Sequence, residues 1–338
     1  MAVETLTRRK PQRRESDSLD QVLNPIRRQL QTVTQRMLSQ LANPVVRRVA
    51  YLITAGGKRL RPALVLLVGG CGDSPNYSAL IDSAAAVELI HTATLIHDDI
   101  IDQAPLRRRQ PSFHARWGTE RAVLMGDYLY ATAFALLTRL RLPYVSQVMA
   151  EVCQQLARGE LREVEARYRL DLSETEYIDI IRDKTASLIG GCCQAGAYIG
   201  ELSPESIGWL TDFGIHMGLA FQITDDCLDL TGRTEQLGKS IHTDLDKGVL
   251  SLPIIYLSES LSSRQRDQLF APLHQGGQNP HFLKRVAQAA QDTGSIAKAQ
   301  AKAQEFARSA KQAIAHSPVN GFAKACQQLA EYAISRRS

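Results

Sequence analysis

The sequence predicts an all-α protein, a single-domain bundle of roughly ten or more helices. Apolar residues recur at the i, i+3 and i+4 spacing of a helix along nearly the whole chain, whereas the alternating runs typical of strands are scarce. The 338 residues are 44% hydrophobic, which is ample for a sizeable core, and no linker composition interrupts them after residue 18. We therefore expect a flexible basic leader over residues 1–18 and one helical domain over residues 19–338.

The individual helices follow from apolar periodicity combined with start and stop signals. Pro62 suits the first turn of a helix after the break at Gly56 and Gly57. Ser203 followed by Pro204 has the pattern of a cap and a first helical turn. Loops are expected at 107–111, which is basic, and at 232–248, which is polar. The expected helices cover 19–41, 79–101, 120–140, 144–167, 174–190, the segment from 203 to 229 and, in a region rich in Ala, Gln and Lys, 279–332.

Composition excludes several classes of protein. The net charge of +5 is modest, and much of the excess lies in the leader, at Arg8, Arg9, Lys10, Arg13 and Arg14. Aromatic residues make up only 6%, so the mixture of basic and aromatic residues typical of nucleic-acid binding is missing, and we expect no nucleic-acid partner. Six cysteines without a C-x-x-C pair favour a reducing compartment. No run reaches the roughly 18 to 20 apolar residues of a spanning helix, so we expect no transmembrane segment and a cytoplasmic location.

A short aspartate cluster occurs twice. Asp-Asp-Ile-Ile-Asp fills 98–102, and Asp-Asp-Cys-Leu-Asp fills 225–229. Residues four apart share one face of a helix, so the first and last aspartates of each cluster point the same way. Carboxylates on apolar helices are rare unless they are paired or bind a metal. Because Mg²⁺ prefers oxygen ligands and is usually completed by substrate phosphates, the two clusters predict a phosphorylated substrate.

Basic and amide side chains accompany both clusters along the sequence. A cage of carboxylates alone would repel a phosphate, whereas a cage that holds Mg²⁺ and is flanked by cations would bind it. Arginine binds phosphate through two parallel hydrogen bonds, and lysine acts as a point charge. The surplus of cations indicates two diphosphates, one bound through metal and one through cations alone. The groups concerned are Lys58, Arg61, His91, Arg107, Arg108, Lys184, Gln222 and Lys239.

These motifs resemble those of the trans-isoprenyl diphosphate synthases, and among them the medium- and long-chain all-trans polyprenyl diphosphate synthases. The resemblance runs from about residue 20 to the end of the chain, with the motifs in the family's order. Any one motif would be weak support, but the whole series is highly specific. The stretches that carry it include Gly-Gly-Lys-Arg-Leu-Arg-Pro at 56–62, His-Asp-Asp-Ile-Ile-Asp at 97–102, Leu-Arg-Arg at 106–108, Lys-Thr-Ala-Ser-Leu at 184–188, Phe-Gln-Ile-Thr-Asp-Asp at 221–226 and Leu-Gly-Lys at 237–239.

The resemblance implies a bundle of the isoprenoid-synthase type around a central cavity, and a Mg²⁺-assisted condensation of an allylic diphosphate with isopentenyl diphosphate. It implies three Mg²⁺ ions on Asp98, Asp102 and Asp225, supported by Asp226 and Asp229. The groups implied at the allylic diphosphate are Arg107, Lys184, Thr185, Gln222 and Lys239, and those at isopentenyl diphosphate are Lys58, Arg61, His91 and Arg108. Catalysis is expected to depend on Asp98, Asp102, Arg107, Lys184, Asp225 and Lys239.

The resemblance also bears on product length. In the family, a bulky aromatic residue five positions before the first cluster blocks the tunnel into which the product grows. That position is Ala93 here, with Thr92 and Thr94 beside it and Ala86 two turns further back. These small side chains would leave the tunnel open, which resembles the synthases that make long all-trans chains, so we expect a long-chain product. A geranylgeranyl- or farnesyl-type product is the alternative.

Four positions depart from the family's pattern. Arg109 and His242 stand where glycines are usual, and His114 stands where asparagine is usual. Val249 replaces a lysine that commonly contacts the allylic diphosphate, although Lys247 lies nearby. We expect these changes to alter details of a loop at the site and not the reaction itself.

Two other functions on the same fold are kept as alternatives. A terpene cyclase would lack the groups that hold isopentenyl diphosphate, and the presence of Lys58, Arg61 and Arg108 argues against it. A non-catalytic regulatory subunit would have lost one aspartate cluster, and this chain keeps both. Because family members are usually homodimers, a homodimer is expected. A loose membrane association is compatible with the hydrophobic product and the basic leader.

Overall fold

The computed structural model describes residues 19–55, 57–108, 110–231, 243–275, 280–317 and 320–335. Within these residues almost all regular structure is helical, which confirms the all-α class. Two short strands, β1 (Leu106–Arg107) and β2 (Gln110–Pro111), pair in antiparallel fashion in the expected basic loop. The helices of the first half are η1 (Asn24–Ile26), α2 (Arg27–Gln40), η2 (Val46–Val49), α3 (Ala50–Thr54), α4 (Leu60–Gly69), α5 (Tyr77–Ile101), α6 (Phe113–Trp117), α7 (Thr119–Arg139) and α8 (Pro143–Glu165). Those of the second half are α9 (Glu174–Ile181), η3 (Arg182–Ala186), α10 (Ser187–Ile199), α11 (Pro204–Thr231), α13 (Thr243–Asp246), α14 (Leu252–Ser260), α15 (Ser263–Phe270), η4 (Ala271–Gln275), α16 (Pro280–Asp292), α17 (Ser295–Ala315) and α18 (Gly321–Ser335).

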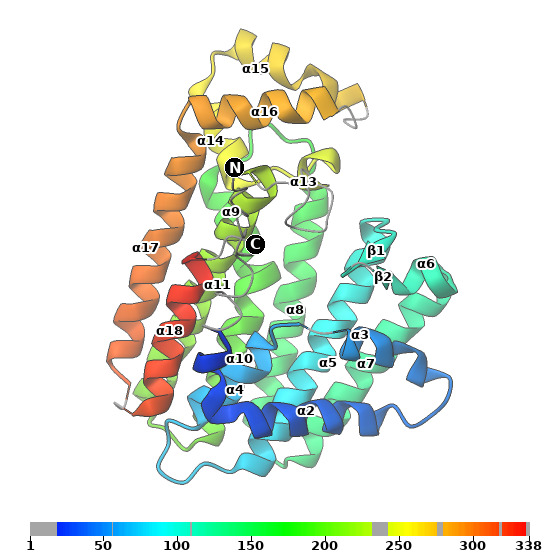
Figure 1. The fold of residues 1–338 in the computed structure, drawn as a ribbon, viewed down its shortest axis with the longest axis vertical. Coiled ribbons are helices and arrows are strands. Elements are labelled where there is room, and N and C mark those ends of the chain that lie inside the picture. The colour runs from blue at the N-terminus through cyan, green and yellow to red at the C-terminus, as the bar shows by residue number, and fades with distance from the viewer. Residues whose placement is uncertain are drawn as a thin grey trace, which may run out of the picture.

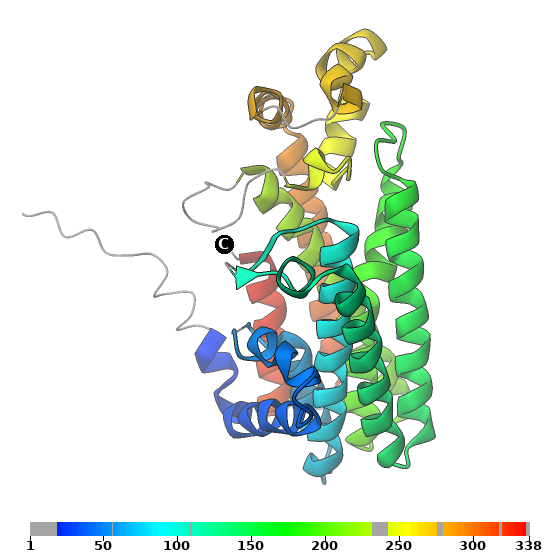
Figure 2. The ribbon, with the colours of Figure 1, turned by 90° about the vertical axis from the view of Figure 1, so that its right-hand side faces the viewer.

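The long helices form a bundle along one axis of the molecule. Figure 1 shows α5, α7, α8, α10 and α11 running in roughly the same or opposite directions, with α17 along one side. Helix α2 crosses the bundle near the end opposite to α15 and α16, and Figure 2 shows the same arrangement after a quarter turn. The carboxyl ends of α5, α8 and α11 lie toward the end that carries α15 and α16. The two aspartate clusters, which lie at the ends of α5 and α11, are therefore brought to one end of the bundle.

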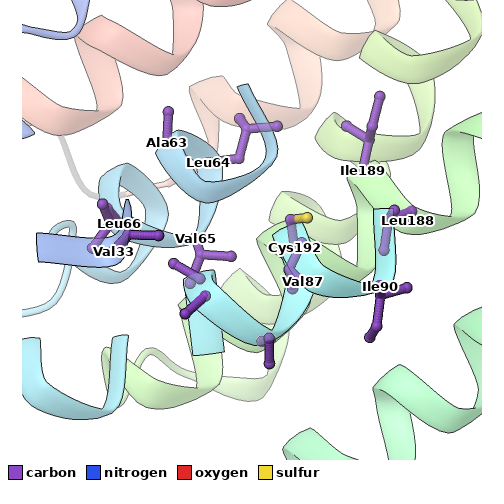
Figure 3. Close-up of a cluster of buried hydrophobic side chains, with 14 of the residues drawn as sticks. Val33, Ala63, Leu64, Val65, Leu66, Val87, Ile90, Leu188, Ile189 and Cys192 are labelled. Atoms are coloured by element: carbon purple, nitrogen blue, oxygen red, sulfur yellow. The ribbon is translucent and has the colours of Figure 1, made fainter. Parts of the chain in front are cut away.

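Helix α5 is held in place by the apolar core. Val65 of α4, Val87 and Ile90 of α5, and Leu188 and Cys192 of α10 belong to one buried cluster (Figure 3). None of these five side chains is more than 1% exposed. Burying a side chain of this kind stabilises the fold by about 1.5 to 3 kcal/mol for the larger aliphatic residues. The last turn of α5, which carries the first aspartates, is thereby fixed relative to α4 and α10.

Side-chain caps define where the helices of the site begin. Asn76 Oδ1 accepts a hydrogen bond from the Ala79 amide at 3.1 Å and starts α5. Ser173 and Glu176 form a reciprocal capping box at the start of α9. Ser203 Oγ accepts from the Ser206 amide at 3.2 Å, which confirms the cap that the sequence predicts for α11.

Three expected helices are interrupted. Pro25 lies in the 3-10 turn η1, so the regular helix α2 begins only at Arg27, because proline has no N–H to continue the helical ladder. The expected helix over 174–190 contains a π-helical turn, η3, between α9 and α10. The expected helical region over 279–332 is divided into α16, α17 and α18, and Gly294, with φ of +73°, separates the first two.

One described helix is long and apolar enough to cross a membrane by length and composition, namely α5. The sequence predicted no such segment, because no run reaches the roughly 18 to 20 apolar residues of a spanning helix. In the structure, 72% of the most apolar window of α5 is buried inside the protein. Its apolar side chains face other helices, as the core helix of a helical bundle requires.

Candidate active site

The first aspartate cluster presents two faces at the end of α5, because successive helical residues point about 100° apart. Asp98 and Asp102 lie one turn apart, whereas Asp99 is buried and accepts a hydrogen bond from Arg107 Nε at 2.9 Å. Burial, together with the nearby Glu160 carboxylate, raises the pKa of Asp98 to about 7. This carboxylate therefore lies where a positive charge would stabilise its ionised form.

Lys184 reaches the same region from the π-helical turn η3. A Cβ atom on Gly159 of α8 would lie 2.4 Å from the Lys184 backbone nitrogen, so glycine permits the close approach of α8 to η3. The ammonium group lies 2.8 Å from Glu160 Oε2 and also bonds Glu163. Burial lowers the pKa of Lys184, but Glu163, Glu160 and Asp98 outweigh burial and raise it above its ordinary value. Lys184 is thus a fixed cation beside Asp98. Single π-helical turns are frequent at functional sites.

A line of hydrogen bonds joins the second aspartate cluster to η3. Thr185 Oγ1 donates to Gln222 Oε1 at 2.9 Å, and Gln222 Nε2 donates to Asp226 Oδ1 at 2.8 Å. The Tyr177 hydroxyl donates to Asp226 Oδ2 at 2.6 Å. Each bond restricts the next, so the orientation of the Gln222 amide is set. Both oxygens of Asp226 are engaged by neighbouring side chains of the protein.

These groups line a first pocket that encloses about 730 Å³, part of which is open to solvent. The polar side chains in its wall are Asp102, Glu163, Lys184, Thr185, Gln222, Asp226 and Lys247. Apolar side chains from the turn and helix after α8 and from the segment before α14 complete the lining; they are Leu172, Tyr177, Ile180, Ile181, Val249 and Leu250. The pocket therefore joins charged groups that suit a diphosphate to an apolar wall.

A second pocket lies on the Asp99 side of α5. It is lined by Arg59, Glu88, His91, Arg107 and Arg108, together with apolar residues. Arg59 is ion-paired to Glu88 and hydrogen-bonded to the Ile53 carbonyl. Arg107, which was expected at the allylic diphosphate, lines this second pocket and is ion-paired to Asp99.

Arg61 contacts His91, which lines the second pocket. Its Nη1 lies 3.1 Å from His91 Nε2. Burial lowers the pKa of Arg61, while the charges of Glu88, Asp225 and Asp98 act in the opposite direction, so the guanidinium lies within electrostatic reach of both aspartate clusters. Burial and the surrounding arginines, Arg61 first, hold the pKa of His91 well below its ordinary value of 6.5. His91 is therefore neutral at physiological pH.

We expect His91→Gln to reduce the dependence of stability on pH. The folded-state pKa of His91 is lowered, so below about pH 6.5 the unfolded chain binds a proton that the folded protein does not, and stability falls. The free energy of unfolding should therefore drop by about 1 kcal/mol more in the wild type than in the variant between pH 7.5 and 5.5. Urea denaturation at the two pH values measures this. His97→Gln, at a more open histidine on the same helix, is the control, and equal pH effects in His91→Gln and wild type would contradict the prediction.

The other residues that the sequence predicts at the site lie at different distances from the two pockets. Lys58 Nζ lies over the Tyr332 ring, 5.2 Å from its centroid, so α18 borders this cation. Asp229 follows Asp225 on the next turn of α11. His114 Nε2 lies 2.8 Å from the Ala104 carbonyl oxygen, and this contact holds the loop that follows α5 against α6. The expected groups Lys239, Arg109 and His242 lie outside the described residues.

The donor set fits Mg²⁺. Within the described ranges, no three acidic, histidine or cysteine side chains converge to form a metal cage of their own. Mg²⁺ seldom uses such cages, because it keeps several waters and is usually bound by one or two carboxylates together with substrate phosphates. Asp98 and Asp102 on α5 supply such a carboxylate pair, and a bound cation would favour the ionised form of Asp98, whose pKa is raised to about 7.

Sequence reasoning missed several groups of the site. Glu160 and Glu163 hold Lys184, and their i, i+3 spacing on the amphipathic helix α8 is the signal that could have indicated them. Arg167 bonds Asp102, and Tyr177 bonds Asp226, across long separations in sequence. Nothing in the sequence marks these last two residues.

Comparisons with known proteins find relatives along nearly the whole chain. The model of the polyprenyl synthetase family matches residues 43–290. The short chain isoprenyl diphosphate synthase of Methanothermobacter thermautotrophicus is 34% identical over 325 residues, which cover 94% of this chain and 99% of that protein. The octaprenyl diphosphate synthase of Escherichia coli is 33% identical over 287 residues, which cover 85% of this chain and 88% of that protein. A crystal structure of polyprenyl synthase from Caulobacter crescentus, complexed with calcium and isoprenyl diphosphate, has a TM-score of 0.90 and 31% identity, and covers 95% of this chain and 98% of that one.

Proposed function

This chain belongs to the polyprenyl synthetase family and is a trans-prenyltransferase, and we propose that its product is a long all-trans polyprenyl diphosphate. The reaction condenses an allylic diphosphate with isopentenyl diphosphate and lengthens the chain by one isoprene unit in each cycle. Enzymes of this family are generally Mg²⁺-dependent. Three Mg²⁺ ions per site, and the roles of individual residues, belong to the proposal.

We assign the first pocket to the allylic diphosphate and the second to isopentenyl diphosphate. Asp98, Asp102 and Asp225 would hold Mg²⁺, with Asp229 in support and Asp226 acting by orienting Gln222. Mg²⁺ bound by these aspartates would neutralise the charge that develops on the departing diphosphate. Lys184 adds a fixed positive charge on the same side, since Glu160 and Glu163 hold its ammonium group beside Asp98.

The second pocket supplies the cations for isopentenyl diphosphate. Arg108 lines this pocket and offers a guanidinium group, and Arg61 offers another from beside His91, whose neutral ring it contacts. Lys58 belongs to the same proposed set.

The apolar wall of the first pocket excludes water from the allylic carbocation that forms when the C–O bond breaks. The double bond of isopentenyl diphosphate then attacks this cation, and the departed diphosphate accepts the proton that is lost.

The observation that carries the long-chain proposal is the small side chain at Ala93. Ala93 and Ala86 of α5 are both fully buried, and their spacing of seven places them on one side of the helix. A growing chain that follows this side of α5 meets methyl groups and no aromatic ring at either position. Ala93 would therefore leave room that a bulky residue would close.

The proposal is tested by incubating the purified protein with Mg²⁺, isopentenyl diphosphate and farnesyl diphosphate, followed by mass spectrometry of the products. We expect products several isoprene units longer than the primer. Products that stop at the geranylgeranyl length would overturn the long-chain proposal and establish the short-chain alternative. The absence of product from farnesyl, geranyl and dimethylallyl diphosphates would contradict elongation and favour a regulatory subunit.

A terpene cyclase is disfavoured by the second pocket. A cyclase binds a single diphosphate, whereas here His91 and Arg108 line a second pocket that also contains Asp99, and Arg61 contacts His91. The same assay distinguishes the two functions, because a cyclase releases diphosphate and a hydrocarbon from an allylic substrate alone.

The proposed homodimer is supported by exposed apolar side chains on two packed helices, α7 and α8. Val123, Leu124 and Tyr128 of α7 are 42%, 67% and 39% exposed, and Leu161 and Val164 of α8 are 64% and 40% exposed. Exposed apolar groups in such number favour an interface, which sedimentation of the purified protein checks.

The six free cysteines support the proposed cytoplasmic location, which cell fractionation checks.

A further inference from the structure

Two cations from separate segments bracket Asp102. Arg167, just after α8, places Nη2 3.1 Å from Asp102 Oδ1. Lys247, just after α13, places Nζ 3.1 Å from Asp102 Oδ2. Each oxygen of one carboxylate thus has its own cation, and the three side chains are only 22–29% exposed. One negative charge in the wall of the first pocket, that of Asp102, therefore faces two positive charges.

A backbone contact explains why both cations reach the same carboxylate. The Tyr168 amide donates a hydrogen bond to the Gly248 carbonyl at 2.7 Å. Both residues adopt the left-handed conformation, with φ of +65° and +75°. A Cβ atom on Gly248 would lie 2.6 Å from the Tyr168 ring, so only glycine fits there. Arg167 and Lys247 directly precede these two joined residues, so the contact sets both side chains at Asp102.

The position of Lys247 also accounts for a departure in the sequence. Val249 stands where the family resemblance leads one to expect a lysine at the allylic diphosphate, and it lines the first pocket. An isopropyl group cannot bind an oxyanion. Lys247, two residues earlier and across Gly248, lines the same pocket and presents its ammonium group at Asp102. The cation is thus available at the same wall from a different residue.

Arg167 carries unused hydrogen-bonding capacity. Its Nε is buried and has no hydrogen-bond partner within the described part of the chain. A buried N–H without an acceptor costs about 1 to 3 kcal/mol, and a diphosphate oxygen is an acceptor that arginine binds well. We propose that Arg167 and Lys247 bind the diphosphate of the allylic substrate, and that Lys247 replaces the lysine missing at position 249. The inference rests on the proposed function of the first pocket.

The test compares four variants with the wild type. We expect Lys247→Ala and Arg167→Ala each to raise the KM for farnesyl diphosphate about tenfold, with little change in the KM for isopentenyl diphosphate. The double variant Lys247→Ala/Val249→Lys should recover most of the lost affinity, because it returns an ammonium group to the same pocket wall. Arg169→Ala removes a nearby cation that pairs with Glu176 outside the pocket, and it should leave both KM values unchanged.

A binding measurement keeps the inference independent of turnover. The Kd of an unreactive thio analogue of farnesyl diphosphate, titrated calorimetrically with Mg²⁺ present, should rise about tenfold in the two single variants and recover in the double variant. If the analogue binds equally well to wild type and Lys247→Ala, the cations only balance Asp102 and the inference is wrong. If the wild type makes no polyprenyl product but the analogue binds more weakly to the variants, the proposed function fails while the inference stands.

Discussion

Replacing Asp98 with alanine is expected to lower kcat about a thousandfold, which corresponds to about 4 kcal/mol of lost transition-state stabilisation. Asp98 lies beside Asp102 and within electrostatic reach of Lys184 and Arg61. Its removal would weaken the binding of the cation that neutralises the departing diphosphate. Steady-state kinetics at saturating substrates, with Mg²⁺ varied, measure the effect.

The fold should survive this change. Burial and the neighbouring Glu160 charge already raise the pKa of Asp98 to about 7, so its ionised form contributes no net stability to the folded protein near neutral pH. We expect the thermal midpoint of Asp98→Ala to equal or exceed that of the wild type.

Asp225→Ala is expected to have a similar effect on kcat, because Asp225 is the proposed ligand on the opposite helix. Asp212→Ala removes an exposed aspartate from the same helix, α11, and serves as the matched control. Near-normal turnover of either Asp98→Ala or Asp225→Ala, with the control active, would contradict the assignment of these aspartates as metal ligands.

Ala93→Phe is expected to change the product from a long chain to a short one. Ala93 is fully buried one turn below the cluster, so a phenyl ring must occupy space along the proposed path of the growing chain. Mass spectrometry of the products formed from farnesyl diphosphate gives the chain-length distribution. The reaction rate in the first cycle should change far less than the final length, since the ring lies away from the diphosphate groups.

A second variant separates blocked growth from a damaged fold. Ala86 lies two turns deeper on the same side of α5, about 10 Å from Ala93 along the helix. If the path follows α5, Ala86→Phe should stop growth later and give products of intermediate length. Equal product lengths in wild type, Ala93→Phe and Ala86→Phe would show that this side of α5 does not limit growth. Thermal unfolding of both variants identifies any that are overpacked, which typically costs about 1 to 3 kcal/mol.

Much of the fold could be predicted because its determinants are local. Helix 79–101 was expected from apolar spacing and is α5, Tyr77–Ile101. The expected helix 120–140 is α7, Thr119–Arg139. The expected helix over 174–190 missed the π-helical turn η3, at which Gly159 of α8 packs closely against the Lys184 backbone. Periodicity within one segment carries no information about such a contact.

The sequence by itself determined that the chain is helical and that Asp98 shares a face with Asp102, because helix geometry relates residues that are four apart. Tertiary structure decided which charges meet. It pairs Arg107 with Asp99 in the wall of the second pocket, and it holds Lys184 between Glu160 and Glu163. It also brings Arg167 and Lys247 to Asp102 through the joined backbones of Tyr168 and Gly248. Except for Arg107 and Asp99, which are eight residues apart, these partners lie far apart in sequence, and only the packing of whole helices fixes their separation in space.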